Sequence, residues 1–279
     1  DQNVLNDPLY YDPAEAKAEG RIQGRLSIRE AFKYLLRSRY LIFLALIVFC
    51  YNVVINLTEV IWKFEVHELF SNPSEYSVYM NQVSTVIAII ATASAMFVSG
   101  NAIRIFGWTF TAMLTPAILM ITSIGFFSFF FLKSYSPDPS LFLMGFTPLA
   151  MVVLMGTSQN VLCRAAKYSV FDATKEMAFV PLSPESKLNG KAAIDGVCSR
   201  LGKTGGSIIH QVLLLSLASF TFSAPYVAVL LIVMIGIWMY AVRNVGTEFT
   251  AISTQQPLIT EPFPEFVSNP EMEEKSAPA

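Results

Sequence analysis

Charged residues are scarce in this sequence. Asp, Glu, Lys and Arg make up only 14% of its 279 residues, whereas a soluble domain of ordinary composition carries roughly 25%. Hydrophobic residues account for 53%, and the mean hydropathy is +0.50. This shortage of charge indicates that lipid is the solvent for most of the chain.

Residues that form disulfides or bind metals are also few. The three cysteines, Cys50, Cys163 and Cys198, are odd in number and scattered, which favours neither a disulfide framework nor a zinc site. The two histidines, His67 and His210, lie too far apart for a local metal motif. No catalytic triad or catalytic carboxylate pair is evident, so we expect no enzymatic activity, catalytic residue, metal, cofactor or nucleic-acid partner.

Long apolar runs are what the sequence has instead. A helix needs about 20 apolar residues to cross a hydrocarbon core of roughly 30 Å. The runs are continuously apolar and lack the two-residue alternation of barrel strands. The sequence therefore predicts an all-α membrane protein with six transmembrane helices. The expected spans are 40–61, 78–99, 108–132, 141–163, 204–222 and 224–242.

Basic residues predict the orientation, because they favour the cytoplasmic side of a membrane. Seven precede the first span and seven lie between the fourth and fifth, whereas the opposite side carries only Lys63 and Lys133. We therefore expect both termini, and a loop over 164–203, in the cytoplasm.

The flanking segments differ from the spans in composition. Residues 1–26 are polar and punctuated by Pro and Gly, which is typical of a linker. Residues 27–39 have one apolar and one basic face, which predicts an interfacial amphipathic helix or, alternatively, a soluble linker helix. Residues 243–279 are acidic and contain five prolines, so we expect a disordered tail. Because the chain starts at Asp1 and not at Met, we also expect it to be a fragment.

Two groups of polar residues stand out beside the apolar runs. Asn52, Asn56, Glu59 and Lys63 recur every three or four residues, so they share one helical face, which must point to a bundle interior or a watery cavity. An alternative is that Glu59 and Lys63 form a purely structural pair.

The second group precedes the fifth span. Lys191 and Asp195 share a helical face, and Arg200 and Lys203 form a neighbouring stripe. Cations beside a membrane cavity suit a polyanion such as a phosphate chain, because lysine offers a compact charge and arginine a bidentate fork. A cluster that only sets the membrane orientation explains them equally well.

Four stretches carry a resemblance to a known family. They are 167–182 (KYSVFDATKEMAFVPL), 190–195 (GKAAID), 201–207 (LGKTGGS) and 56–63 (NLTEVIWK). Together they resemble the ATP/ADP translocases of plastids and of obligate intracellular bacteria such as chlamydiae and rickettsiae. The match is most specific between Lys167 and Gln211.

The resemblance implies a major-facilitator-like bundle of twelve spans that exchanges ADP for ATP by alternating access. This chain matches only the second half, so the implied partners are ATP, ADP, membrane lipid and a missing six-span first half. The implied location is a bacterial inner membrane. The positions that fall in matching motifs and align with the family's charged residues are Glu59 and Lys191.

These observations give one hypothesis for the site. The predicted substrate-binding side chains are Lys191, Arg200, Lys203, Asn52 and Asn56. The predicted charge pairs, which break and re-form during exchange, involve Glu59, Lys63 and Asp195. Two alternatives stay open: a major-facilitator porter for another nucleotide or organic anion, and a membrane scaffold that transports nothing.

Overall fold

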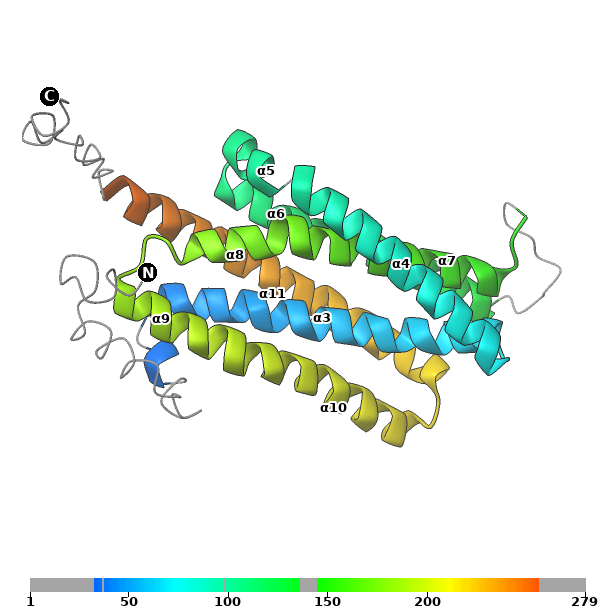
Figure 1. The fold of residues 1–279 in the computed structure, drawn as a ribbon. Helices are drawn as coiled ribbons and strands as arrows, with labels where there is room; N and C mark the ends of the chain where they lie inside the picture. Colours follow the sequence, from blue (N-terminus) through cyan, green and yellow to red (C-terminus); the bar gives the residue numbers. More distant parts are fainter. Residues whose placement is uncertain (1–32, 37, 98, 136–144, 256–279) are drawn as a thin grey trace, which may run out of the picture.

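The computed structural model describes residues 33–36, 38–97, 99–135 and 145–255. Within that part of the chain every regular element is a helix (Figure 1). The first four are α3 (Arg39–Leu69), α4 (Pro73–Phe97), α5 (Ser99–Phe106) and α6 (Trp108–Tyr135). The next three form one continuous rod: α7 (Pro148–Ala166), the π-helical turn η1 (Lys167–Phe171) and α8 (Asp172–Ala178). A second rod consists of α9 (Pro184–Ala193), the π-helical turn η2 (Ile194–Cys198) and α10 (Ser199–Leu217), and α11 (Phe220–Gln255) follows it.

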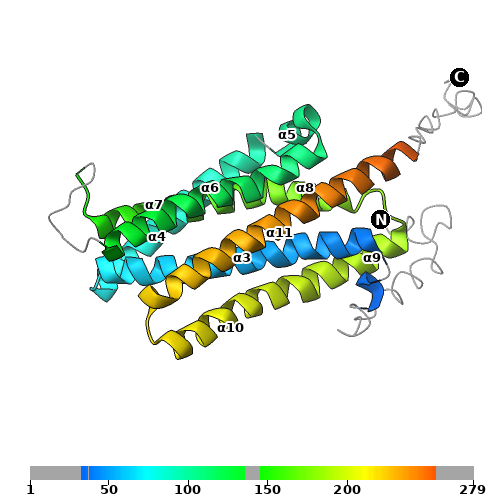
Figure 2. The same ribbon diagram turned by 180° about the vertical axis from the view of Figure 1, so that it is seen from behind.

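Helix α3 lies at the centre of an elongated bundle. It packs against α7, α10 and α11, and most of its apolar side chains are buried. Figure 2 shows α11 crossing in front of α3, on the side of the bundle opposite α4, and it packs against α3 and α6. Packing on several sides explains why most of the sequence of α3 is apolar, while its polar residues lie mostly on one face and at its C-terminal end.

Five helical segments are long and apolar enough to cross a membrane, which confirms an all-α membrane architecture. They are Arg39–Leu69, Pro73–Phe97, Trp108–Tyr135, Pro148–Ala178 and Phe220–Ser253. Helix α10 runs beside α3 in both views (Figures 1 and 2), but it is not among these five. The count of six spans therefore stays a prediction.

The region expected to be a loop over 164–203 is mostly helical. Thr147 caps the start of α7 by accepting a hydrogen bond from the Ala150 amide, and the helix then continues through η1 to Ala178. The charges that suggested a loop do not end the helix, because several of them pair with residues on neighbouring helices. The connection between the two rods is short, and Ser183 caps the start of α9.

The last two helices also differ from their predicted bounds. The chain turns at Ala218, which has a left-handed φ of 54°, whereas the sequence placed the break near Ser223. Helix α11 then runs to Gln255, so residues 243–255 are helical although they were expected to be disordered. Burial of Val245 and stacking of Phe249 on Trp108, with ring centroids 5.4 Å apart, explain this extension because both contacts hold α11 within the bundle.

The predicted flanking segments lie largely outside the described residues. This applies to the linker 1–26, to most of the amphipathic segment 27–39 and to the tail from 256 onward. The described part of the amphipathic segment packs on the second rod. Tyr34 donates a hydrogen bond to the Ser186 hydroxyl at 3.0 Å, and Leu35 is buried.

One ion cluster lies at the opposite end of the bundle from α8 and α9. Lys133 on α6 contacts Glu65 and Glu68 on α3, at 2.7 Å and 2.5 Å. Glu65 is only 1% exposed, so Lys133 supplies the counter-charge that a buried carboxylate needs. The cluster ties α3 to α6 and was not predicted from the sequence.

Glycines allow α10 to approach α3 closely. A Cβ atom at Gly202 would lie 2.8 Å from the Phe49 carbonyl oxygen, and one at Gly206 would lie 2.8 Å from Asn56 Oδ1. Four residues further along, His210 Nε2 lies 2.9 Å from the Leu57 carbonyl oxygen, to which it can donate. These three positions share one face of α10 and fix its distance from α3.

We expect Gly202→Ala to destabilise the protein by about 1–3 kcal/mol, the usual cost of overpacking a tight contact. The added methyl would meet backbone, which cannot rotate away. Thermal unfolding of the complete protein in detergent would measure the change. Gly205→Ala on the same helix is the matched control, because a Cβ there meets nothing within 4 Å. Equal melting temperatures for the two variants would contradict the close contact.

Candidate functional site

A charged cavity of about 440 Å³ lies between α3 and the two rods. Its volume is within the range of small-molecule sites, roughly 300–1,000 Å³. The lining residues of α3 are Val48, Tyr51, Asn52, Ile55 and Glu59. The lining residues of the two rods are Arg164, Lys167, Tyr168, Phe171, Asp172, Lys175, Asp195, Ser199 and Lys203.

The two π-helical turns both border this cavity. Turn η1 carries Lys167, Tyr168 and Phe171, and η2 carries Asp195. A π turn is rare and is frequently found at functional sites. Lys175, one turn beyond η1, reaches Asp195 in η2 at 2.9 Å, so an ion pair joins the two rods beside the cavity.

The cavity carries more positive than negative charge. Its lining contains four basic side chains and three carboxylates. Lys167 pairs with Asp172 at 2.9 Å, and Arg164 contacts Glu59 at 3.4 Å. Lys203 has no carboxylate partner in the part of the chain that the structure describes. An anion that enters therefore meets one unpaired ammonium and three cations shared with carboxylates.

The structure brings four of the predicted site residues to this cavity, namely Asn52, Glu59, Asp195 and Lys203. The predicted Glu59–Lys63 pair is present, with a distance of 2.8 Å. Asp195, the third residue of the predicted charge pairs, pairs with Lys175 on the neighbouring rod.

The other predicted site residues lie outside the lining. Asn56 sits against Gly206 in the α3–α10 contact, where its Oδ1 is 3.5 Å from the Ser207 hydroxyl. Arg200 is exposed on α10. Lys191 on α9 is not in the lining and pairs with Glu176 on α8, which also contacts the lining residue Lys175 at 3.6 Å.

Sequence reasoning missed four charged residues that the cavity contains: Arg164, Lys167, Asp172 and Lys175. Their signal was the recurrence of polar residues every three to five positions, which puts them on one side of a continuous helix. It was overlooked because 164–203 was interpreted as a loop.

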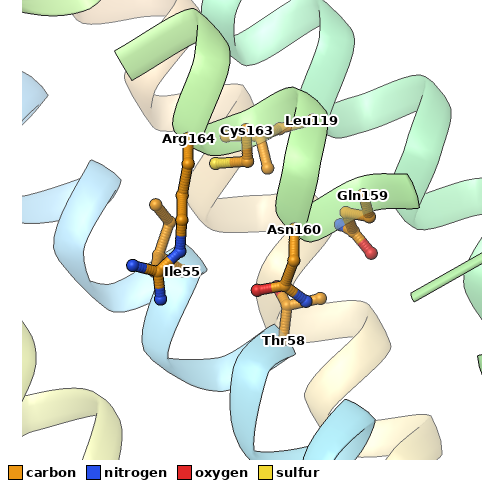
Figure 3. Close-up of a pocket in the computed structure, with 7 residues that line it drawn as sticks. All are labelled: Ile55, Thr58, Leu119, Gln159, Asn160, Cys163 and Arg164. Carbon is orange, nitrogen blue, oxygen red and sulfur yellow. The ribbon is translucent and has the colours of Figure 1, made fainter. Parts of the chain in front are cut away.

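A small pocket lies next to the charged cavity, and the two share Ile55 and Arg164 (Figure 3). Arg164 and Asn160 extend from α7 towards α3, where Ile55 and Thr58 line the opposite wall. Gln159 donates a hydrogen bond to the Ser123 hydroxyl at 2.6 Å. The pocket measures about 10 Å³, roughly the space of one water molecule, so Arg164 borders both a large and a very small cavity.

The cysteines offer no reactive group to this site. All three are free and buried. Burial raises the pKa of the Cys198 thiol in η2, which keeps it neutral and poorly nucleophilic near neutral pH. Within the described residues, no three His, Cys, Asp or Glu side chains are grouped so that they could hold a metal ion.

Comparison with known proteins gives the family. A family model described as the TLC ATP/ADP transporter matches residues 1–249. The chain belongs to this family. Membership confirms the resemblance seen in the sequence and, with the apolar helices, identifies an integral membrane protein of a transporter family.

Several curated relatives of this chain are named as ADP,ATP carrier proteins. ADP,ATP carrier protein 1 of Chlamydia muridarum is 42% identical over 250 residues, which cover 90% of this chain and 47% of that relative. ADP,ATP carrier protein 1 of Rickettsia typhi is 36% identical over 253 residues, which cover 90% of this chain and 50% of the relative. The chain thus spans about half the length of the curated relatives it matches, and no solved structure matches it.

Proposed function

We propose that this chain is the C-terminal half of a membrane carrier that exchanges ATP for ADP by alternating access. The observation that carries the proposal is the charged cavity, with four cations and three carboxylates beside α3. A polyanionic ligand suits this composition, because its phosphates can replace carboxylates as partners of the same cations. The relatives named as ADP,ATP carriers indicate which polyanion to test first.

Ion pairs in the cavity give a physical route to obligatory exchange. In the proposed cycle, Arg164, Lys167 and Lys203 bind phosphates, so Glu59 loses Arg164 but keeps Lys63, and Asp172 loses Lys167. Without nucleotide the carboxylates hold the same cations and keep the rods in place. Each nucleotide would then favour reorientation only through its stronger binding to one arrangement of the helices.

A first half of the carrier would cover the exposed helices. In α4 only Val83 and Ala91 are buried, and in α10 only Gly202, Gly206 and His210. We propose that both helices face the missing six-span half, which would complete the cavity. The relatives, about twice as long as the matched region, supply enough chain for such a partner.

We also propose an orientation in a bacterial inner membrane. The start of α3 and the end of α11 lie at the same end of the bundle, next to α8 and α9 (Figure 1). Lys175, Lys187 and Lys191 belong to this end of the two rods. Because basic residues favour the cytoplasm, this end would face it.

Exchange by the complete carrier in liposomes tests the proposed function. Vesicles loaded with ADP should take up labelled ATP, and empty vesicles should not. Unlabelled ADP should compete better than other nucleoside triphosphates, sugar phosphates or inorganic phosphate. Stronger competition by another anion would favour a different porter. Absence of any uptake, with the protein folded and inserted, would favour the scaffold.

A further inference from the structure

Two cavities of different chemistry meet at one side chain. The charged cavity described above and a groove along α4 both include Tyr168 in their lining. The groove has a volume of about 650 Å³. Its other lining residues, mostly small or apolar, are Ser84, Ile87, Ala88, Ala91, Thr92, Ala95 and Met96.

Tyr168 differs from the other aromatic residues of the charged cavity. Tyr51 and Phe171 are each only 5% exposed and stack on one another, with ring centroids 4.4 Å apart. Tyr168 is 47% exposed. The Lys167 ammonium lies 4.3 Å from the centroid of the Tyr168 ring and leaves much of the remaining ring surface accessible. Of the three aromatic side chains in this lining, Tyr168 is therefore the one with enough exposed ring surface for another ring to stack on it.

The paired cavities match a molecule with one polyanionic end and one flat, weakly polar end. The ammonium groups of Lys167 and Lys203 belong to the charged side. On the other side, the short side chains of Ala88, Ala91 and Ala95 keep the groove open. A nucleotide has both ends, joined by a ribose.

We propose that Tyr168 is the platform on which the nucleobase stacks, so that the base lies in the α4 groove and the phosphates lie in the charged cavity. The assignment rests on the proposed nucleotide exchange. This assignment of Tyr168 places the two ends of the nucleotide in separate sites. It therefore predicts that a substitution can remove the base contacts without removing the phosphate contacts.

The test uses the complete carrier and two probes, ATP and inorganic tripolyphosphate. Stacking of one base on an aromatic ring is worth a factor of about 5 to 150 in affinity. Tyr168→Ala should weaken ATP binding by a factor in that range and leave tripolyphosphate binding unchanged. Tyr168→Phe should bind ATP as the wild type does, because the ring face remains. Tyr226→Ala, which removes an exposed tyrosine on α11, is the matched control.

Several outcomes would contradict the platform. Unchanged ATP affinity in Tyr168→Ala would mean that a helix of the first half or a lipid chain occupies the groove. Equal losses for ATP and tripolyphosphate would assign Tyr168 to the phosphate site. An equal loss of ATP affinity in Tyr168→Phe would mean that the hydroxyl group matters and the ring does not.

Wild-type protein provides a second measurement that needs no substitution. Photolabelling with 8-azido-ATP, whose reactive group is on the base, should modify Tyr168 or residues 84–96. Modification confined to α10 would place the base elsewhere and reject the assignment while nucleotide binding itself stands. If the wild type bound neither ATP nor tripolyphosphate, the proposed function would fail, and the platform with it.

Discussion

Replacing Lys203 with glutamine in the complete carrier is expected to weaken ATP binding by about 10- to 100-fold. A hydrogen bond to a charged group contributes about 1.5–3 kcal/mol, and each 1.4 kcal/mol is roughly tenfold in affinity. Lys203 should give the full effect because, among the described cations of the cavity, it has no carboxylate partner. The loss should be larger for ATP than for AMP, since the triphosphate carries more charge. Titration calorimetry with both nucleotides measures it.

Lys187→Gln is the matched control for this experiment. Lys187 is exposed on α9 and does not line the cavity, so its neutralisation should leave both affinities unchanged. Equal affinities for the wild type and Lys203→Gln would remove Lys203 from the site. Equal losses in the two lysine variants would mean that general surface potential attracts the nucleotide.

Glu59→Gln should slow exchange by about tenfold, with little effect on folding. The carboxylate contacts Lys63 and Arg164, which are both more than a third exposed, so losing these pairs costs little stability. Without Glu59, however, Arg164 keeps no carboxylate partner among the described residues and should hold phosphate more tightly. One such contact of about 1.4 kcal/mol would slow nucleotide release about tenfold. Exchange rates and ATP affinity in liposomes would show a slower rate with equal or tighter binding.

Glu185→Gln, on the exposed start of α9, serves as the control for Glu59. If the Glu59 variant exchanges at the normal rate, the Glu59 pairs serve only to hold α3 beside α7. A large fall in melting temperature would also assign them a structural role.

Much of the fold could be predicted because its signals are local. Long apolar runs predicted the helices of the five candidate spans, and the polar stripe of α3 predicted that Asn52 and Glu59 lie inside the bundle. Both predictions depend only on the pattern of apolar and polar residues within a single helix. The Glu59–Lys63 pair is predictable for the same reason, since its two members are four residues apart.

What could not be predicted depends on contacts between distant segments. Lys175 pairs with Asp195 across two rods, and Lys133 neutralises the buried Glu65 across α3 and α6. Lys191 follows the same rule, because its partner Glu176 lies on another helix. Pairing of charges also explains why the sequence underestimated the length of the helices, since paired charges do not require a solvated loop.

The π turn η1 makes the cavity depend on the length of the chain as well as on its side chains. A π turn holds one residue more than an α turn, and each residue of an α-helix advances the chain by about 100°. A relative that lost one residue within 168–171 could keep Arg164, Lys167 and Lys175 and still turn one of them away from the cavity. Deletion of a single codon in a relative's gene can therefore abolish the site although every charged residue is still present in its sequence.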